Sequence, residues 1–225
     1  MHDPFARDYA VRDFKRYLKT ERKAKPASVN LELAAIDHFS QFLGLDRVRV
    51  QREDIPQKSP RALKPEAQKE FLRAVERSSS LRDQALAHLL FYTGVRLSEC
   101  AALDVSDILI SARKGQVIVR SGKGETYREV PLNAEVRNAL KDWLRDRSKR
   151  FPRSSDPALF LSLKGKRLST RAIDLILRQL GADTNLELSA HILRHTCLTK
   201  RVRRGNDLVL VAEVAGHQRL ETTRR

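Results

Sequence analysis

The sequence predicts a mostly α-helical protein of the α+β class, with a small N-terminal helical part and a larger, mainly helical domain that carries one small antiparallel sheet. Three observations lead to this prediction. Apolar residues recur at helical spacing along most of the 225 residues. One stretch, residues 116–130, has the pattern of a β-hairpin with a glycine-rich tip. A basic, proline-containing stretch separates the first two predicted helices from the remainder.

The N-terminal part is predicted to contain two helices. The first runs over residues 9–20, and the second begins at Pro26 and ends at Gly44, because proline suits a helix start and glycine a helix stop. The residues at helical spacing are Tyr9, Val11, Phe14, Tyr17 and Leu18 in the first helix and Leu31, Ala34, Ala35, His38, Phe39 and Phe42 in the second. Two helices are a small body for a domain, so we expect them to rest against another surface.

Residues 55–65 are predicted to form an extended, basic linker. They contain Pro56, Pro60 and Pro65, each of which removes a backbone donor and restricts the residue before it. After the linker we expect helices at 66–75, 81–92 and 98–103, strands at 116–120 and 126–130, a helix at 135–147, a strand at 158–163 and a helix at 171–180. A final apolar stripe comprises Leu208, Val211, Ala212 and Ala215.

The charge balance favours a polyanionic partner. The chain has 44 Lys and Arg against 28 Asp and Glu, a net charge of +16, and most of the excess lies in residues 56–225. Nucleic acid rewards such an excess through counterion release, although a solubilising surface or a basic ribosomal or membrane-surface protein would share it. We find no apolar run of membrane-spanning length and no signal pattern. The two cysteines predict neither a disulfide framework nor a Cys-rich zinc site.

Two cations stand where a plain helical fold does not require them. Arg96 is at the beginning of a predicted helix, where free N–H groups and a guanidinium together suit an anion, but it could equally pair with Glu99 on the surface. Lys123 lies between two glycines at the hairpin tip, where a backbone can approach a ligand closely. An ordinary solvated turn lysine would fit the same pattern.

Four residues near the C-terminus have similar double interpretations. His191 and Arg194 share a helix face at i and i+3, and a histidine capping a helix beside a surface arginine would explain them as well. His195 follows His191 at i+4, but Ile192 replaces the glutamate of a metalloprotease helix and a third ligand is lacking, so no metal is predicted. His217 follows a glycine that would end the preceding helix, and it could simply cap that helix.

Taken in order, these segments resemble the conserved boxes of the tyrosine recombinases, the phage-integrase and Xer-type family. Residues 89–99, LLFYTGVRLSE, resemble the first box, and Gly122-Lys123-Gly124 with 128–132, REVPL, resembles the hairpin with the catalytic lysine. Residues 189–196, SAHILRHT, resemble the His-x-x-Arg box. Residues 215–218, AGHQ, with Thr222-Thr223 resemble the box before the nucleophile. The resemblance covers residues 27–225.

The resemblance implies a domain plan. Residues 1–54 would be part of a SAM-like helical core-binding domain, 55–65 the linker, and 66–225 the catalytic domain without its C-terminal end. The family's nucleophilic tyrosine follows the Gly-His histidine by nine residues, which is position 226, and none of the four tyrosines in the chain matches it. We therefore expect a fragment that binds DNA but does not cut it.

The resemblance also implies a mechanism, a site-specific recombinase that breaks and rejoins DNA through a 3′-phosphotyrosyl intermediate. Arg96 and Arg194 would clamp the scissile phosphate, and Lys123 would protonate the leaving oxygen. His191 and His217 would bind the phosphate or manage the nucleophile's proton, and Glu99 would orient Arg96. No metal or other cofactor is required. The implied partner is a double-stranded recombination site, held by a homotetramer on two duplexes in a prokaryotic cytoplasm at the nucleoid, with no membrane.

Four alternatives remain open at the level of sequence. A non-catalytic DNA-binding protein or regulator of the same fold would keep the basic face. It would not need the five residues that the resemblance makes catalytic, which are Arg96, Lys123, His191, Arg194 and His217. An RNA-binding protein would show more aromatic residues than the 6% present here. A metal-dependent nuclease would need clustered carboxylates, for which Asp104 and Asp107 are the one close pair near the motifs. A type IB topoisomerase shares the recombinase chemistry but relaxes supercoils without a defined site.

Overall fold

The structure is a computed structural model that describes residues 4–55, 62–120, 127–182, 184, 186–205 and 207–215. The chain separates into two compact units, residues 1–58 and 59–225. The middle of the predicted linker and the tip of the predicted hairpin lie outside the described residues. None of the described helices is both long enough and apolar enough to cross a membrane.

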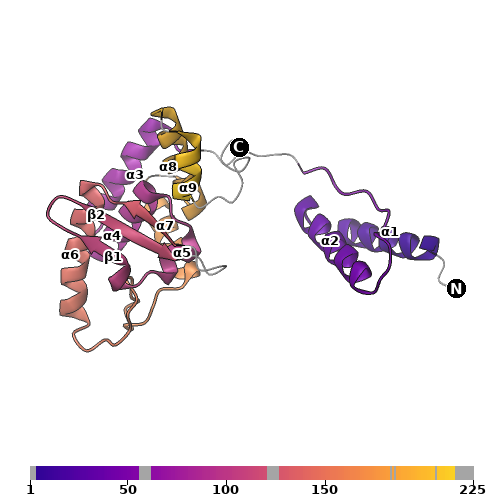
Figure 1. Ribbon diagram of the computed structural model, residues 1–225, viewed down its shortest axis with the longest axis horizontal. Coiled ribbons are helices and arrows are strands. Elements are labelled where there is room, and N and C mark those ends of the chain that lie inside the picture. Colours follow the sequence, from indigo (N-terminus) through magenta and orange to yellow (C-terminus); the bar gives the residue numbers. More distant parts are fainter. Residues whose placement is uncertain are drawn as a thin grey trace. The chain divides into compact units, whose positions relative to one another are not determined.

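The N-terminal unit consists of helices α1 (Pro4–Thr20) and α2 (Pro26–Phe42), followed by an extended segment (Figure 1). Pro26 stands in the first turn of α2, as its fixed φ predicts. The segment after α2 returns along both helices, because Asn30 and Glu53 exchange two hydrogen bonds of 2.8 Å and Lys15 pairs with Glu53 at 2.7 Å. The buried core is small and comprises Val11, Leu18, Val29 and Leu33.

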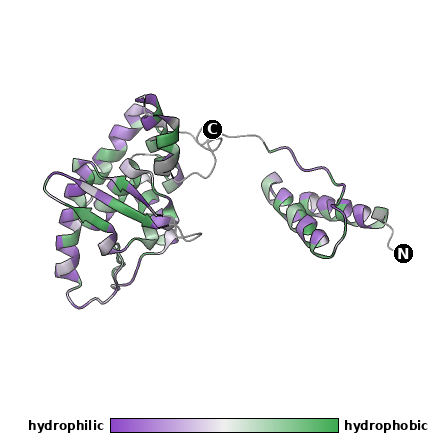
Figure 2. Cartoon of the chain, viewed as in Figure 1, coloured by the Kyte–Doolittle hydropathy of each residue, from purple (hydrophilic) through white to green (hydrophobic). Residues whose placement is uncertain are grey.

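Only part of the apolar pattern of these two helices is buried within their own unit. Val11 and Leu18 are buried, but Tyr9, Phe14 and Tyr17 of α1 are exposed. In α2 the buried apolar residues are Val29 and Leu33, whereas Leu31, Phe39 and Phe42 of the apolar pattern are exposed. Figure 2 shows that hydrophobic and hydrophilic stretches alternate along both helices. Two helices bury only one narrow face against each other, so periodicity alone does not say which apolar stripe occupies it.

The larger unit is built around helix α4 (Leu81–Thr93), which packs against α3 (Pro65–Arg77), α6 (Ala134–Arg150) and α8 (Ala190–Arg203) (Figure 1). Buried Leu86, Leu89 and Leu90 place α4 in the centre of the main core. Ser80 caps its first turn by accepting the Asp83 N–H. Helices α7 (Thr170–Ala182) and α9 (Leu208–Ala215) complete the unit, and Val211 and Ala212 of the predicted final stripe are buried.

The sheet is antiparallel, as predicted, but it has three strands in the order β1 (Ile108–Ile110), β2 (Gly115–Arg120) and β3 (Tyr127–Pro131). The register pairs Val117 with Val130, and both side chains enter the core. The short strand β1, which follows the 3-10 turn η1 (Val105–Asp107), was not predicted. The strand predicted at 158–163 is wrong, because that segment makes only isolated bridges at Ala158 and Leu161.

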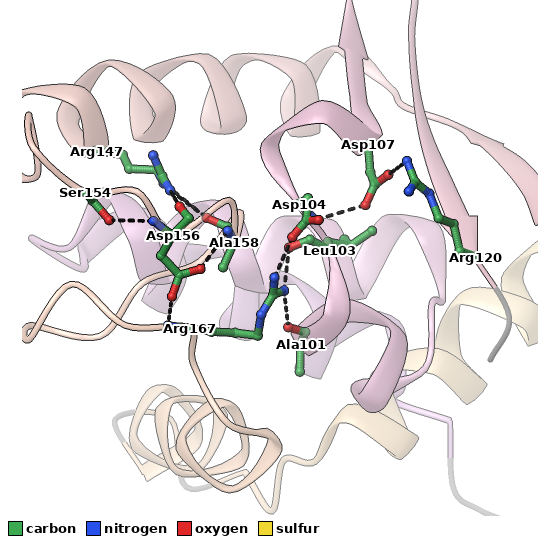
Figure 3. A network of polar contacts seen from close by, with 10 residues as sticks. All are labelled: Ala101, Leu103, Asp104, Asp107, Arg120, Arg147, Ser154, Asp156, Ala158 and Arg167. Atoms are coloured by element: carbon green, nitrogen blue, oxygen red, sulfur yellow. Dashed lines mark hydrogen bonds and ion pairs between the residues drawn. The ribbon is translucent and has the colours of Figure 1, made fainter.

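A network of arginines and aspartates fixes the connection between α6 and α7 (Figure 3). Arg147 of α6 donates through Nη2 to the carbonyl oxygens of Asp156, at 2.7 Å, and Ala158, at 2.9 Å. Arg167 donates through Nη1 to the carbonyl oxygens of Ala101 and Leu103, both at 3.1 Å. These carbonyls end helix α5 (Leu97–Ala102), so the network holds the C-terminal end of the helix that begins at the candidate site.

Candidate active site

The turn between α4 and α5 carries the first candidate residues. Helix α4 ends at Thr93 and is capped by Gly94, which adopts the left-handed conformation with φ of 69° and whose N–H donates to the Leu90 carbonyl. The chain then turns through Val95 to Arg96, the residue that caps α5. The expected helix begins at Leu97, and the anion that meets the Arg96 N–H belongs to the chain itself, because this N–H donates to the Glu99 carboxylate at 2.7 Å.

Replacing Gly94 with alanine is expected to lower the free energy of unfolding by about 2 kcal/mol, since an L-residue in the left-handed region costs about 1–2 kcal/mol. An added Cβ would also lie 3.3 Å from Sγ of Cys197. Gly205→Ala is the matched control, because its φ is 78° but nothing lies within 4 Å of its added Cβ. Urea unfolding of both variants separates strain from contact, and an equal loss in both would contradict a role for Cys197.

The Glu99 carboxylate is the centre of the site. Its Oε1 accepts Nη1 of Arg96 at 2.8 Å and Nη1 of Arg128 at 3.0 Å. Its Oε2 accepts the Arg96 N–H and Nη2 of Arg128, both at 2.7 Å. Burial raises the pKa of this carboxyl group, but the hydrogen bonds from Arg128 and Arg96 outweigh burial and hold the pKa at about 2, against an ordinary value of 4.5.

This lowered pKa predicts a specific acid response. The unfolded chain takes up a proton at Glu99 near pH 4.5 while the folded chain does not, so the stabilisation is complete above that pH and is lost as the pH falls towards 2. Glu99→Gln lacks this proton uptake. We therefore expect the difference in the free energy of unfolding between wild type and Glu99→Gln to decrease by up to about 3 kcal/mol as the pH is lowered from 5 to 2. Urea unfolding at several pH values measures it, and a pH-independent difference would contradict the assignment.

Arg194 reaches the same place from helix α8. Ser189 caps this helix by accepting the Ile192 N–H at 3.3 Å. Arg194 is only 8% exposed and donates through Nη1 to the Gly94 carbonyl at 2.5 Å. Burial, followed by repulsion from Arg96, lowers its pKa to about 10. The alternative in which Arg194 covers the helix surface is therefore wrong, because its guanidinium is buried next to Arg96.

The remaining candidate residues are less well placed. His191 is exposed in the first turn of α8, and it lies near His195, whose pKa is lowered by burial and then by His191. Lys123 and His217 lie outside the described residues, so the structure places neither of them. Within the described ranges, no three His, Cys, Asp or Glu side chains are grouped as a metal site would require.

Arg128 belongs to the site, although the sequence pattern assigned it no role. It lies in β3, and its guanidinium binds both oxygens of Glu99 from a position 29 residues further along the chain. The alternation of exposed and half-buried residues along β3 points the Arg128 side chain towards α5. An arginine in a strand directly after a glycine-rich tip is a weak signal, and only the register of the hairpin shows where it points.

The electrostatics of this cluster suit a phosphoryl group. Arg96, Arg128 and Arg194 face one carboxylate, so the cluster keeps two net positive charges. Guanidinium groups donate paired N–H bonds in the geometry of phosphate oxygens and stay charged at every physiological pH. A partly buried site strengthens that attraction relative to water. The arrangement can therefore bind and stabilise an anionic phosphodiester.

Comparisons with known proteins agree with this chemistry. The sequence model of the phage integrase family matches residues 61–225. The chain is 34% identical over 217 residues to the tyrosine recombinase XerC of Roseiflexus castenholzii, covering 90% of this chain and 68% of that protein. It superposes on the crystal structure of XerA recombinase with a TM-score of 0.68 at 28% identity, covering 96% of this chain and 76% of that one. The Tn1549 transposon integrase, in complex with transposon right end DNA, has a TM-score of 0.75 at 18% identity, covering 96% and 79%, and shows the shared fold.

Proposed function

This chain belongs to the phage integrase family of tyrosine recombinases, which are site-specific DNA recombinases, and from that premise we propose that it provides the phosphate-binding site for DNA strand transfer through a 3′-phosphotyrosyl intermediate. The observation that supports this most directly is the buried Arg194 guanidinium beside Arg96 and Glu99. A regulator that only holds DNA would gain nothing from burying an arginine, which costs desolvation.

In the proposed reaction, a tyrosine hydroxyl attacks the scissile phosphorus in line with the leaving group. The new bond joins the tyrosine oxygen to the 3′-phosphate, and the bond from phosphorus to the 5′ oxygen breaks. Arg96 and Arg194 stabilise the charge on the non-bridging oxygens. Lys123 gives the leaving 5′ oxygen its proton, and His191 and His217 bind the phosphate or take the tyrosine proton. Glu99 orients Arg96. Strand rejoining reverses these steps.

The proposed substrate is duplex DNA carrying a recombination site. The surplus of basic residues in 56–225 supports this partner, because phosphate neutralisation releases counterions. We also propose that the recombining assembly is a homotetramer on two duplexes, since each of four strands must be cut once. The residues 1–54 would then contact DNA as part of a core-binding domain.

The decisive test is covalent capture of DNA. We would express the polypeptide extended through the codons that follow Arg225 in its gene, here called the extended chain, and select its binding site from genomic duplex fragments. A nicked version of that site prevents religation and accumulates the adduct. We expect a tyrosine at position 226 and an SDS-stable protein–DNA adduct at the 3′ end that survives a metal chelator.

The possible outcomes separate the candidate functions. An adduct whose formation requires Arg96 supports the recombinase proposal. DNA binding without an adduct, with Arg96→Ala binding as well as wild type, would indicate a DNA-binding regulator of the same fold and overturn the catalytic proposal. Cleavage that stops on chelation would indicate a metal-dependent nuclease. Adducts on any supercoiled DNA, without a preferred site, would indicate a topoisomerase.

A further inference from the structure

Helix α5 needs support from outside, because its six residues make too few internal hydrogen bonds to fix its position. Its C-terminal end is held by Arg167, whose bonds to the Ala101 and Leu103 carbonyls are drawn in Figure 3. The other end presents Arg96 and Glu99 to the site. Whatever holds that end determines where the Arg96 guanidinium lies.

Arg128 makes that contact. Its two Nη atoms bind the two oxygens of Glu99 in a parallel fork, the strongest geometry for an arginine–carboxylate pair. The Arg128 side chain is 13% exposed, whereas the Arg96 side chain is 42% exposed. Of the two partners of Glu99, Arg96 is therefore the one more accessible to a ligand, and Arg128 is the more buried one.

The charge balance explains why this contact matters for Arg96. A carboxylate 2.8 Å from Arg96 competes with a phosphate for the same guanidinium. Arg128 supplies a second cation to that carboxylate, so Arg96, Arg128 and Glu99 together keep one positive charge. Without Arg128, Glu99 would have to be neutralised largely by Arg96, whose attraction for an anion would fall.

We propose that Arg128 is a positioning residue for the strand-transfer reaction. By binding Glu99, Arg128 keeps Arg96 oriented towards the scissile phosphate and keeps its positive charge available to that phosphate. The proposal rests on the proposed function. Arg128 also lies one residue into β3, directly after the segment that carries Lys123. The pair of hydrogen bonds between Arg128 and Glu99 therefore connects β3, which follows the proposed general acid, to α5, which Arg96 caps.

The first test compares two arginines on neighbouring strands in the extended chain. Arg128→Met should slow adduct formation roughly 50-fold, as expected for a small displacement of a reacting group, while the Kd for the DNA site changes less than about threefold. Arg120→Met is the matched control. Arg120 pairs with Asp107 at 2.6 Å and lies directly before the hairpin tip on β2, but it does not contact Glu99 in the described structure (Figure 3). Equal losses in both variants would overturn the proposal.

A second test asks whether Arg128 acts through Glu99. In Arg128→Met, the Glu99 carboxylate is left to be neutralised by Arg96. The neutral amide of Glu99→Gln does not compete for Arg96 in this way. The double variant Arg128→Met/Glu99→Gln should therefore form the adduct at least about fivefold faster than Arg128→Met alone. A rate equal to the product of the two single losses would show that Arg128 acts independently and would overturn the proposal. Arg128→Lys keeps the charge but loses the paired hydrogen bonds, so its rate of adduct formation should lie between those of wild type and Arg128→Met. It replaces Arg128→Met if that variant fails to fold.

A third test does not depend on covalent chemistry. The Nε–H resonance of Arg96 in the present chain can be followed by NMR during titration with inorganic phosphate. Arg128→Met should weaken the apparent Kd at least about threefold, whereas Arg120→Met should not. An unchanged Kd in Arg128→Met overturns the positioning role even if the adduct forms. An extended chain that forms no adduct, with the Kd difference intact, overturns the recombinase proposal alone.

Discussion

Replacing Arg194 with lysine is expected to slow covalent adduct formation about 1000-fold in the extended chain, while DNA binding stays within about threefold of wild type. Lysine keeps the positive charge but loses the planar fork that matches two phosphate oxygens. It also loses the geometry of the bond to the Gly94 carbonyl, which holds the buried guanidinium next to Arg96. The measurement is the single-turnover rate of adduct formation on the nicked site.

The matched control for this variant is Arg178→Lys. Arg178 lies on α7, is exposed and pairs with Asp174 of the preceding helical turn at 2.8 Å. Such surface pairs contribute little, so this variant should behave as wild type. If Arg194→Lys forms the adduct at a rate within tenfold of wild type, the guanidinium of Arg194 does not contact the phosphate in the transition state. Parallel loss of DNA affinity would indicate a folding defect instead.

Replacing Trp143 with alanine is expected to lower the free energy of unfolding of the larger unit by about 4 kcal/mol. Trp143 lies on α6 with 2% of its surface exposed, and its ring stacks on Phe160 with centroids 6.4 Å apart. Its Nε1–H donates to the Leu159 carbonyl at 2.9 Å. The substitution therefore leaves a cavity and an unsatisfied buried carbonyl in the same place.

Two controls separate these contributions. Trp143→Phe keeps an aromatic ring but loses the donor, so it should cost less than the alanine variant. Leu163→Ala removes a large side chain that is 84% exposed and should change the stability by less than about 0.5 kcal/mol. Urea unfolding followed by far-UV circular dichroism measures all three. A Trp143→Ala loss below 1 kcal/mol would contradict the packing seen around α6.

Several features of this protein followed from local sequence alone. The helix predicted at 81–92 is confirmed as α4, because leucine and alanine favour a buried helix and the glycine that follows permits the left-handed cap. The mainly helical fold with one small antiparallel sheet is confirmed as well. Both depend on periodicity and turn residues, which act over a few neighbouring positions. The order of the four boxes likewise identified the family, which the comparisons confirm.

Other features were decided by the tertiary structure. Helical spacing alone did not determine which residues of α2 are buried, because more than one apolar stripe on that helix could meet its partner. The sequence indicated Arg96, Glu99 and Arg194 through the family pattern, and it gave no role to Arg128. The contact between Arg128 and Glu99 spans 29 residues, and the one between Arg194 and Gly94 spans 100. Local spacing carries no information about such contacts. They form only when helix α8 packs against α4 and the hairpin takes its register, which together bring distant side chains into a partly buried space where charges must be paired.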